Sequence, residues 1–289
     1  MPDSTLDQQQ VFNLVFQALQ SCAYNYPVYN YLTQQQNHLR SLLVKESPNP
    51  LVKKGQKYYS QNDEDGILLE ILSRIGLLDQ KDRPSFMEYG VGNGLENNSI
   101  ILLMLGWIGA WAGNQDLEFK AYDKKKLHYS QGWVSLDNIL TIYSSGLSSL
   151  DLAEYDVVSM DLDGNDFHFI KAILESGHKP KVFITEYNSK FPPPINFTVA
   201  YDPSHVFSGN DYMGASLQTL HDLFAAQGYF LAACNITGSN AFFVHGDYRN
   251  RFTDVPQSIH QLFAPPNYGI VTRSGHPPSA QTIASFISP

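Results

Sequence analysis

Cysteine and positive charge are both scarce in this chain. Its 289 residues include two cysteines, Cys22 and Cys234, which lie far apart and outside any metal-ligand pair. This argues against a disulfide framework and a thiolate metal site, so we expect buried thiols in a cytoplasmic, reducing compartment. Nineteen Lys and Arg residues stand against 28 Asp and Glu, for a net charge of −9. Because nucleic acids and anionic membranes need a basic face, we expect neither as a partner.

Long hydrophobic runs and several common catalytic motifs are also missing. The longest apolar run, residues 99–113, contains three glycines and is shorter than the roughly 20 residues of a membrane span. The polar, acidic N-terminus shows no signal peptide. No Gly-x-x-x-x-Gly-Lys loop is present, which argues against nucleotide hydrolysis. The segment around Ser216 lacks the Gly-x-Ser-x-Gly elbow of serine hydrolases.

The most informative stretch is Phe86–Asn98, where a short apolar run with the acid Glu88 is followed by three glycines at every second position. These are Gly90, Gly92 and Gly94. Glycine lets the backbone turn sharply and lets a ligand approach the amides, and the next segment reads as a helix that starts at the loop. Glu88 would then lie at the carboxyl end of the first strand, where open α/β sheets bind ligands.

Strands and helices alternate along the rest of the chain. We expect further strands at 107–112, 133–136, 156–161, 181–185, 229–233 and 240–245, and helices at 137–143, 167–176 and 214–227. Residues 120–126 read as a turn or helix, and residues 189–213 as a long binding loop or lid. This pattern predicts an α/β fold, doubly wound around a mostly parallel, seven-stranded Rossmann-like sheet with an antiparallel edge hairpin.

The two ends of the chain read differently from the middle. Residues 1–50 read as an N-terminal helical extension, with a break near Pro27, a second helix over 29–43, and a proline-containing linker at 47–50. Residues 51–250 form the expected Rossmann domain, and residues 251–289 an irregular C-terminal tail packed on it. The extension could cover a cleft, form a homo-oligomer or simply pack on the domain, and packing is the simplest of these.

Several motifs together resemble the FkbM-type branch of S-adenosylmethionine-dependent methyltransferases. They are Tyr-Ser-Gln-x-x-Glu-Asp-Gly at 59–66, Glu-x-Gly-x-Gly-x-Gly-x-x-Asn-Asn at 88–98 and Gly-Trp-x-Gly at 106–109. The second half, with Ser-x-Asp-x-Asp-Gly-Asn-Asp at 159–166 and Glu-Tyr-Asn at 186–188, resembles a subgroup of methyltransferase-like proteins. The resemblance covers residues 58–247. It implies the class I methyltransferase fold, S-adenosylmethionine as cofactor, and methyl transfer to an oxygen or nitrogen of a small molecule, often a sugar or natural product.

The resemblance also implies where the cofactor lies. The residues expected around it are Gln61, Asp65, Glu88, Gly90, Gly92, Gly94, Asn98, Asn114 and Asp137. One feature of the family is missing, because Gly113 stands where an acid at the end of the second strand usually holds the ribose hydroxyls. Asn114 or Asp116 could substitute for it. Losing a charge-assisted pair of hydrogen bonds costs about 1.5–3 kcal/mol of affinity.

Polar side chains follow the fourth and fifth predicted strands and mark the catalytic candidates, Asp161, Asp163, Glu186 and Asn188. One acid could be a general base. Alternatively, the acids could bind a divalent metal ion through oxygen ligands, joined by His168 or His205, or recognise a cationic substrate. The simplest alternative is a turn in which Asp166 caps the next helix.

Three functions therefore remain open. The first is a small-molecule methyltransferase whose acceptor faces these acids, with Phe207 and Tyr212 among the aromatic residues that could line an acceptor pocket. The second is a metal-dependent enzyme on the same fold, centred on Asp161, Asp163 and Glu186. The third is a non-catalytic binding protein that uses its N-terminal helices to meet a partner.

Overall fold

A computed structural model describes residues 27–79, 84–120, 122–270 and 277–288. The chain divides into two compact units, residues 1–43 and residues 44–289, and each is considered by itself. Helix α2 (Pro27–Glu46) confirms the helix predicted after the break at Pro27. The earlier helix predicted around Val11 and Leu14 lies outside the described residues. Among the described helices, none combines the length and the apolar character that a membrane span requires.

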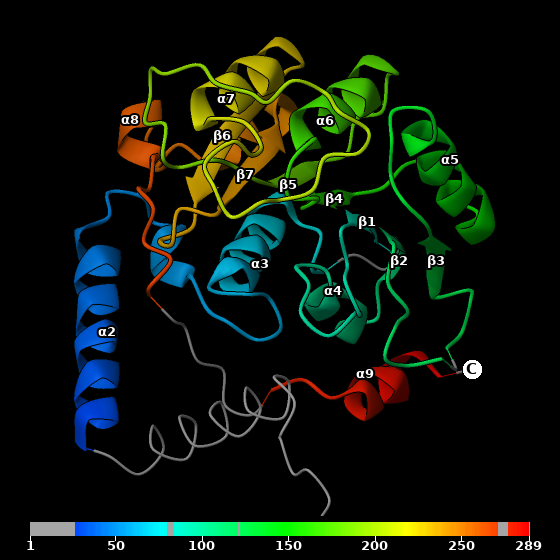
Figure 1. Ribbon diagram of the computed structural model, residues 1–289, viewed down its shortest axis with the longest axis horizontal. Coiled ribbons are helices and arrows are strands. Elements are labelled where there is room, and N and C mark those ends of the chain that lie inside the picture. The colour runs from blue at the N-terminus through cyan, green and yellow to red at the C-terminus, as the bar shows by residue number, and fades with distance from the viewer. Residues whose placement is uncertain (1–26, 80–83, 121, 271–276, 289) are drawn as a thin grey trace, which may run out of the picture. The chain divides into compact units, whose positions relative to one another are not determined.

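A seven-stranded sheet with the order β3-β2-β1-β4-β5-β7-β6 forms the centre of the second unit. Its strands are β1 (Ser85–Tyr89), β2 (Ile108–Gly113), β3 (Leu127–Gln131), β4 (Val157–Met160), β5 (Val182–Glu186), β6 (Tyr229–Cys234) and β7 (Asn240–His245). The first five strands run parallel, whereas β7 pairs antiparallel with both β5 and β6. This confirms the predicted mostly parallel sheet with an antiparallel edge hairpin (Figure 1).

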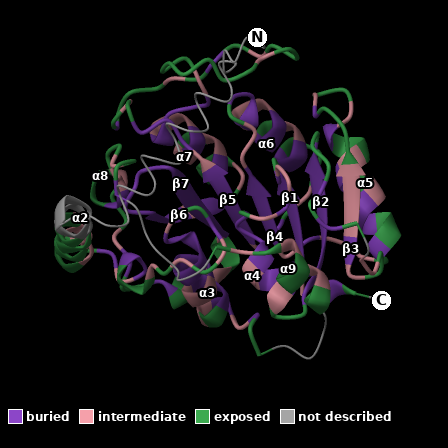
Figure 2. Ribbon diagram, turned by 60° about the horizontal axis from the view of Figure 1, so that its bottom comes forward, coloured by how far each residue is buried: buried purple, intermediate pink, exposed green. Residues whose placement is uncertain are grey.

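Helices cover both faces of this sheet (Figure 1). On one face lie α5 (Ile139–Leu150), α6 (Asp166–Glu175) and α7 (Leu217–Ala226), and on the other lie α3 (Glu64–Ile75), α4 (Ile100–Met104) and α9 (Ala280–Ile287). The short helices η1 (Val52–Lys54), η2 (Gly246–Arg251) and α8 (Ile259–Leu262) complete the unit. Every residue of β1, β2 and β4 is buried (Figure 2), as expected for parallel strands covered on two sides.

The third strand was predicted in the wrong place. It is β3, residues 127–131, whereas residues 133–136 form a loop that leads into α5. The Asn138 side chain stabilises this loop, since it accepts from the Ser135 amide at 2.8 Å and donates to the Trp133 carbonyl at 2.8 Å. β3 lies at the edge of the sheet and is mostly only partly buried, so its polar residues hid the strand from a search for apolar runs.

The sequence predicts an irregular C-terminal tail, but part of this tail is helical. Ser279 caps α9 by accepting a hydrogen bond from the Thr282 amide at 3.1 Å, and Ile283 and Ile287 are fully buried. The helix packs against α4. It is also bonded to the turn before β3, where Lys126 Nζ donates to the Phe286 carbonyl at 3.1 Å. In the residues described between β2 and β3 no helix occurs, and α9 lies beside α4 on that face of the sheet.

Candidate functional site

The three glycines after β1 have different structural roles. All three have positive φ angles, +88° at Gly90, +52° at Gly92 and +81° at Gly94. A Cβ atom on Gly90 would lie 1.6 Å from the Asp161 carbonyl oxygen, and one on Gly94 would lie 2.9 Å from Leu117 Cδ2. A Cβ atom on Gly92 would have no neighbour within 4 Å. Gly90 and Gly94 therefore permit close packing, while Gly92 borders open space.

The Glu88 carboxylate stabilises the segment that follows the glycine loop. Its Oε1 atom accepts from the Asn98 amide at 2.9 Å, and its Oε2 atom accepts from the Ser99 amide at 2.9 Å and from the Ser99 hydroxyl. Burial raises the pKa of Glu88, although these donors act in the opposite direction. Asn98 in turn donates to the Ser159 hydroxyl on β4 at 3.1 Å. Glu88 and Asn98 thus hold the loop and the start of α4 in place.

A cavity of about 430 Å³ opens above this loop at the carboxyl edge of the sheet. Its walls come from the ends of β1 to β4, from α6 and from the loop after β5. The lining residues are Gly90, Gly92, Gly113, Asn114, Gln115, Gly132, Trp133, Val134, Asp161, Leu162, Asp163, Asn165, Phe169, His205, Val206 and Phe207. The volume is typical of a small-molecule site, and the position is where open α/β sheets bind ligands.

Gly113 ends β2 and borders the cavity. A Cβ atom there would lie 3.3 Å from Val91 Cγ2 and 3.5 Å from the Tyr129 hydroxyl oxygen, so a side chain would fit if Val91 moved slightly. Asn114 lines the cavity, whereas Asp116 does not and accepts a hydrogen bond from Gln131 at 3.1 Å. Of the two expected substitutes for the missing acid, Asn114 is therefore the one in reach of a ligand.

Residues 201–207, here called the strap, close one side of the cavity. Trp133 Nε1 donates to the Pro203 carbonyl at 2.8 Å, and the Leu136 amide donates to the Tyr201 hydroxyl at 2.9 Å. On the β4 side, Asn165 Nδ2 donates to the Asp202 carbonyl at 2.7 Å. The strap is thus bonded to both flanks of the cavity, and it carries His205, Val206 and Phe207 into the lining.

Three of the four predicted catalytic residues come together beside the cavity. One carboxylate oxygen from each of Asp161, Asp163 and Glu186 lies within 4.8 Å of the others. The turn that presents the two aspartates is held by Asp166, which accepts from the Leu162 amide at 2.8 Å and the Gly164 amide at 2.9 Å. Asp163 has a φ of +56°. A left-handed backbone is unfavourable for a residue other than glycine, and residues held in such a conformation are common at functional sites.

The electrostatics of this cluster are unusual. Desolvation raises the pKa of Asp161 well above its ordinary value, and the carboxylates of Asp166, Asp163 and Glu88 raise it further. Desolvation likewise raises the pKa of Glu186, and Asp161 adds to the effect. Like charges this close compete for ionisation, so the cluster retains protons at a pH where an isolated carboxyl group has lost its own.

We therefore expect the unliganded protein to lose stability as the pH rises above the ordinary carboxyl pKa of about 4. The folded cluster holds protons that the unfolded chain releases, so the free energy of unfolding falls with pH, by up to about 1.4 kcal/mol per pH unit for each such proton. Urea titrations between pH 5 and 8 would measure the slope. In Glu186→Gln the slope should be smaller, and an unchanged slope would contradict the prediction.

The remaining candidates at the N-terminal side do not line the cavity. Asp65 is buried, and its Oδ2 atom accepts from the Tyr58, Tyr59 and Ser60 amides at 2.6, 2.7 and 2.9 Å. It therefore shapes the turn before α3. Gln61 lies in that turn with an exposed side chain, and its carbonyl accepts from Lys57 Nζ at 2.7 Å.

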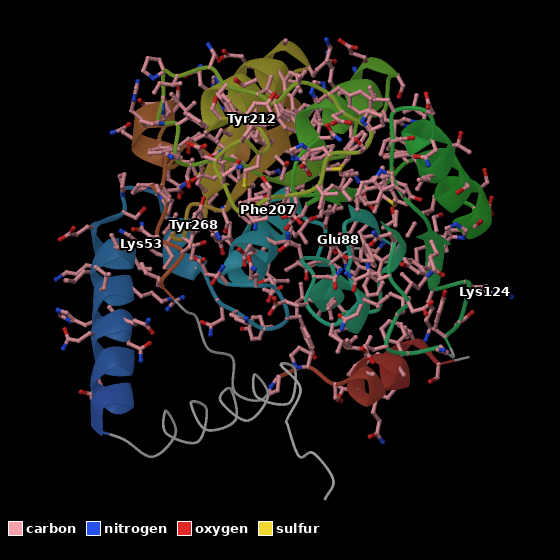
Figure 3. All side chains as sticks on the ribbon, in the orientation of Figure 1. Lys53, Glu88, Lys124, Phe207, Tyr212 and Tyr268 are labelled. Atoms are coloured by element: carbon pink, nitrogen blue, oxygen red, sulfur yellow. The ribbon has the colours of Figure 1, made fainter. Side chains whose placement is uncertain are left out.

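Asp137 and Asn188 also lie outside the lining. Asp137 is exposed, at the start of α5. Asn188 is buried, and its Nδ2 atom donates to the Asp211 carbonyl at 2.9 Å and the Met213 carbonyl at 3.0 Å. Asn188 thus fastens the loop between β5 and α7, on which Figure 3 labels Phe207 and Tyr212.

Sequence reasoning missed several residues of the site. Gln115 and Val134 line the cavity, and Trp133 both lines it and bonds to the strap. Trp133 was assigned to a strand, and Gln115 carries no motif of its own. The available signal was positional, because residues that directly follow a strand of a parallel sheet lie at its ligand-binding edge.

No protein-family model matches this chain, and no curated protein matches it, so the FkbM-type assignment stays a prediction. Some solved structures show a distant likeness to it. A chain described as a ribosomal RNA methyltransferase from Plasmodium falciparum is 12% identical, with a TM-score of 0.38 over 65% of this chain and 97% of its own.

Two further neighbours are similar at the same level. The O-methyltransferase TomG from Streptomyces achromogenes, solved with S-adenosylmethionine, is 15% identical with a TM-score of 0.37, over 74% of this chain and 96% of its own. An O-methyltransferase family protein from Burkholderia thailandensis is 9% identical with a TM-score of 0.35, over 76% of this chain and 73% of its own. On its own strand order, β3-β2-β1-β4-β5-β7-β6, the chain has the class I methyltransferase fold.

Proposed function

We propose that this protein is an S-adenosylmethionine-dependent methyltransferase that acts on an oxygen or nitrogen of a small molecule. The observation that carries the proposal is the open space above Gly92, at the ligand-binding edge of the sheet and beside three clustered carboxylates. We also propose that the protein is cytoplasmic, as its few cysteines suggest, and that it acts in natural-product or sugar metabolism, as the FkbM resemblance implies. The N-terminal helices are the proposed site of any self-association.

The cavity residues fit the proposed cofactor in several respects. S-adenosylmethionine, when bound, supplies an electrophilic methyl group on a positively charged sulfur. Gly92 would let the cofactor approach the loop backbone, and Asn114 and Gln115 offer neutral hydrogen-bonding groups where the family has an acid. Trp133 and Val134 provide apolar surface for a flat ring. The strap would exclude water from the same space.

The acceptor side of the proposed site is formed by the clustered acids. Asp161 lines the cavity and lies against both Asp163 and Glu186, so it is the group best placed to take a proton from the acceptor. Its raised pKa brings its proton affinity closer to that of such an acceptor. Glu88 and Asn98 act indirectly, because they hold the loop against which the cofactor would lie.

Filling the space above Gly92 should abolish cofactor binding without unfolding the protein. Asn tolerates the left-handed backbone that Gly92 adopts, so Gly92→Asn places a side chain in open space at little cost in strain. We expect micromolar binding of S-adenosylmethionine to the unaltered protein and at least about a 100-fold loss in the variant, which corresponds to roughly 2.8 kcal/mol of binding free energy. Calorimetric titration measures both.

Gly106 offers a matched control, because it also has a positive φ, +84°, and open space around its Cβ position. It precedes β2, at the opposite edge of the sheet from the cavity. Gly106→Asn should bind S-adenosylmethionine normally. The proposed function is refuted if the unaltered protein does not bind the cofactor at millimolar concentration.

A second candidate is a metal-dependent enzyme on this fold. It is favoured by the carboxylate cluster, since oxygen donors are the ligands that Mg²⁺ and Ca²⁺ prefer. Asn188 would add little to such a site, because its amide is bonded to two backbone carbonyls. Calorimetric titration with MgCl₂ or CaCl₂ tests this candidate directly, and Asp161→Ala should remove any binding.

A further inference from the structure

The three clustered carboxyl groups lack compensating partners. Within the described part of the chain, no hydrogen bond or ion pair involves the side chain of Asp161, Asp163 or Glu186. The neighbouring acids differ, since Asp166 and Glu88 accept backbone amides. Unpaired carboxylates that crowd one another are costly unless a cation joins them.

The carbonyl oxygen of a buried amide beside the cluster also lacks a partner. Asn240 is 4% exposed, and β5–β7 pairing places it directly opposite Glu186, so the two side chains lie on the same face of the sheet. Its Nδ2 atom donates to Glu64 at 3.2 Å, which fixes the orientation of the amide because a carboxylate can only accept. The Asn240 Oδ1 atom is buried without a hydrogen bond. Within the described residues, no donor reaches this acceptor.

Apolar side chains line the cavity together with Asp161 and Asp163. Leu162 and Phe169 contribute from the β4–α6 side, and Val206 and Phe207 from the strap. Val206 is 69% exposed and Phe207 is 47% exposed. Exposed apolar groups beside a polar pocket favour a ligand that covers them, which a hydrated metal ion would not do.

We infer that the methyl acceptor is an amine attached to an apolar group, whose nitrogen is bound by Asp161, Asp163, Glu186 and the Asn240 carbonyl oxygen. This inference rests on the proposed function and deepens it. The ammonium form supplies three N–H donors and a positive charge, which these four oxygen-bearing groups share, and the apolar group covers Val206 and Phe207. Charge-assisted hydrogen bonds to the carboxylates give the selectivity over a neutral alcohol of the same shape.

The transfer balances with residues of this cluster. Asp161 removes one proton from the bound ammonium group, which frees the nitrogen lone pair. The nitrogen forms a bond to the methyl carbon as the carbon–sulfur bond breaks, and that bonding pair stays on sulfur. The cofactor thereby becomes a neutral thioether, the product is a methylated ammonium ion, and the proton leaves from Asp161 to solvent.

Thermal unfolding with a panel of probes tests the inference. The full-length protein is saturated with S-adenosylhomocysteine, and 2-phenylethylamine, benzylamine, hexylamine, 2-phenylethanol or MgCl₂ is added. We expect at least one amine to raise the melting temperature and the alcohol and MgCl₂ to leave it unchanged. Glu186→Gln and the exposed Asp163→Asn should each weaken amine binding by roughly 10- to 100-fold. The control Glu175→Gln removes an exposed acid at the far end of α6 and should bind normally.

The other outcomes overturn the inference. Equal stabilisation by 2-phenylethanol would mean that charge does not select the acceptor. Stabilisation by MgCl₂ that disappears in Glu186→Gln would assign the cluster to a metal ion instead. No response to any amine, with S-adenosylhomocysteine bound, would exclude the amine while leaving the proposed methyltransferase intact. Failure to bind the cofactor at all would instead refute the proposed function.

Discussion

Asp161→Asn is expected to lower the rate of methyl transfer by about 10²- to 10⁴-fold, the usual contribution of a general base. The amide has nearly the same shape as the carboxyl group but cannot accept the acceptor's proton. It also removes one of several crowded negative charges, so the folded protein should be at least as stable as the unaltered one. Formation of S-adenosylhomocysteine under saturating cofactor measures the rate.

The pH dependence of that rate separates a base from a structural role. In the unaltered protein the rate should rise with pH through the raised pKa of Asp161, because only the ionised form accepts a proton. In Asp161→Asn this rise should disappear, while cofactor affinity stays within a few-fold. A variant with a reduced rate but the same pH profile would show that Asp161 acts through positioning alone.

The glycine loop and the acids could be predicted from the sequence because their signals are local. Buried parallel strands appear as short apolar runs, and the residue after each run must lie at the same edge of the sheet. This reasoning brings Gly92, Asp161, Asp163 and Glu186 together, and the structure places them so. Local signals also located the hairpin of β6 and β7.

The sequence predicts a binding loop or lid at residues 189–213, and the strap within it does line the cavity. The bonds that hold the strap could not be predicted, because they join distant segments. Its bonds join Trp133 to Pro203, Leu136 to Tyr201 and Asn165 to Asp202. None of these pairs has a sequence pattern, and the role of Trp133 follows only from the register of β3. α9 was missed for a similar reason, since its apolar face is short and is stabilised by packing against α4.

The same distinction between local pattern and tertiary packing applies to the three glycines, which look alike in sequence. Gly90→Ala should be the most damaging single substitution in the loop, with a loss of about 3 kcal/mol or more in the free energy of unfolding. A left-handed backbone costs an alanine about 1–2 kcal/mol, and overpacking adds about 1–3 kcal/mol. Here the new methyl group would lie 1.6 Å from the Asp161 carbonyl oxygen, so β1 and β4 would have to separate.

Gly92→Ala is the matched comparison, because it brings a similar backbone strain and no contact within 4 Å. Its cost should stay near 1–2 kcal/mol, about 2–4 °C in melting temperature for a unit of this size, against a drop of about 6 °C or more for Gly90→Ala. Differential scanning calorimetry of the two variants measures the difference. Equal losses would mean that backbone strain alone governs the loop. A much larger loss at Gly90 would show that the close contact between Gly90 and the Asp161 carbonyl governs this part of the loop. The same contact sets the position of the Asp161 backbone, and it therefore keeps Asp161 beside the space above Gly92.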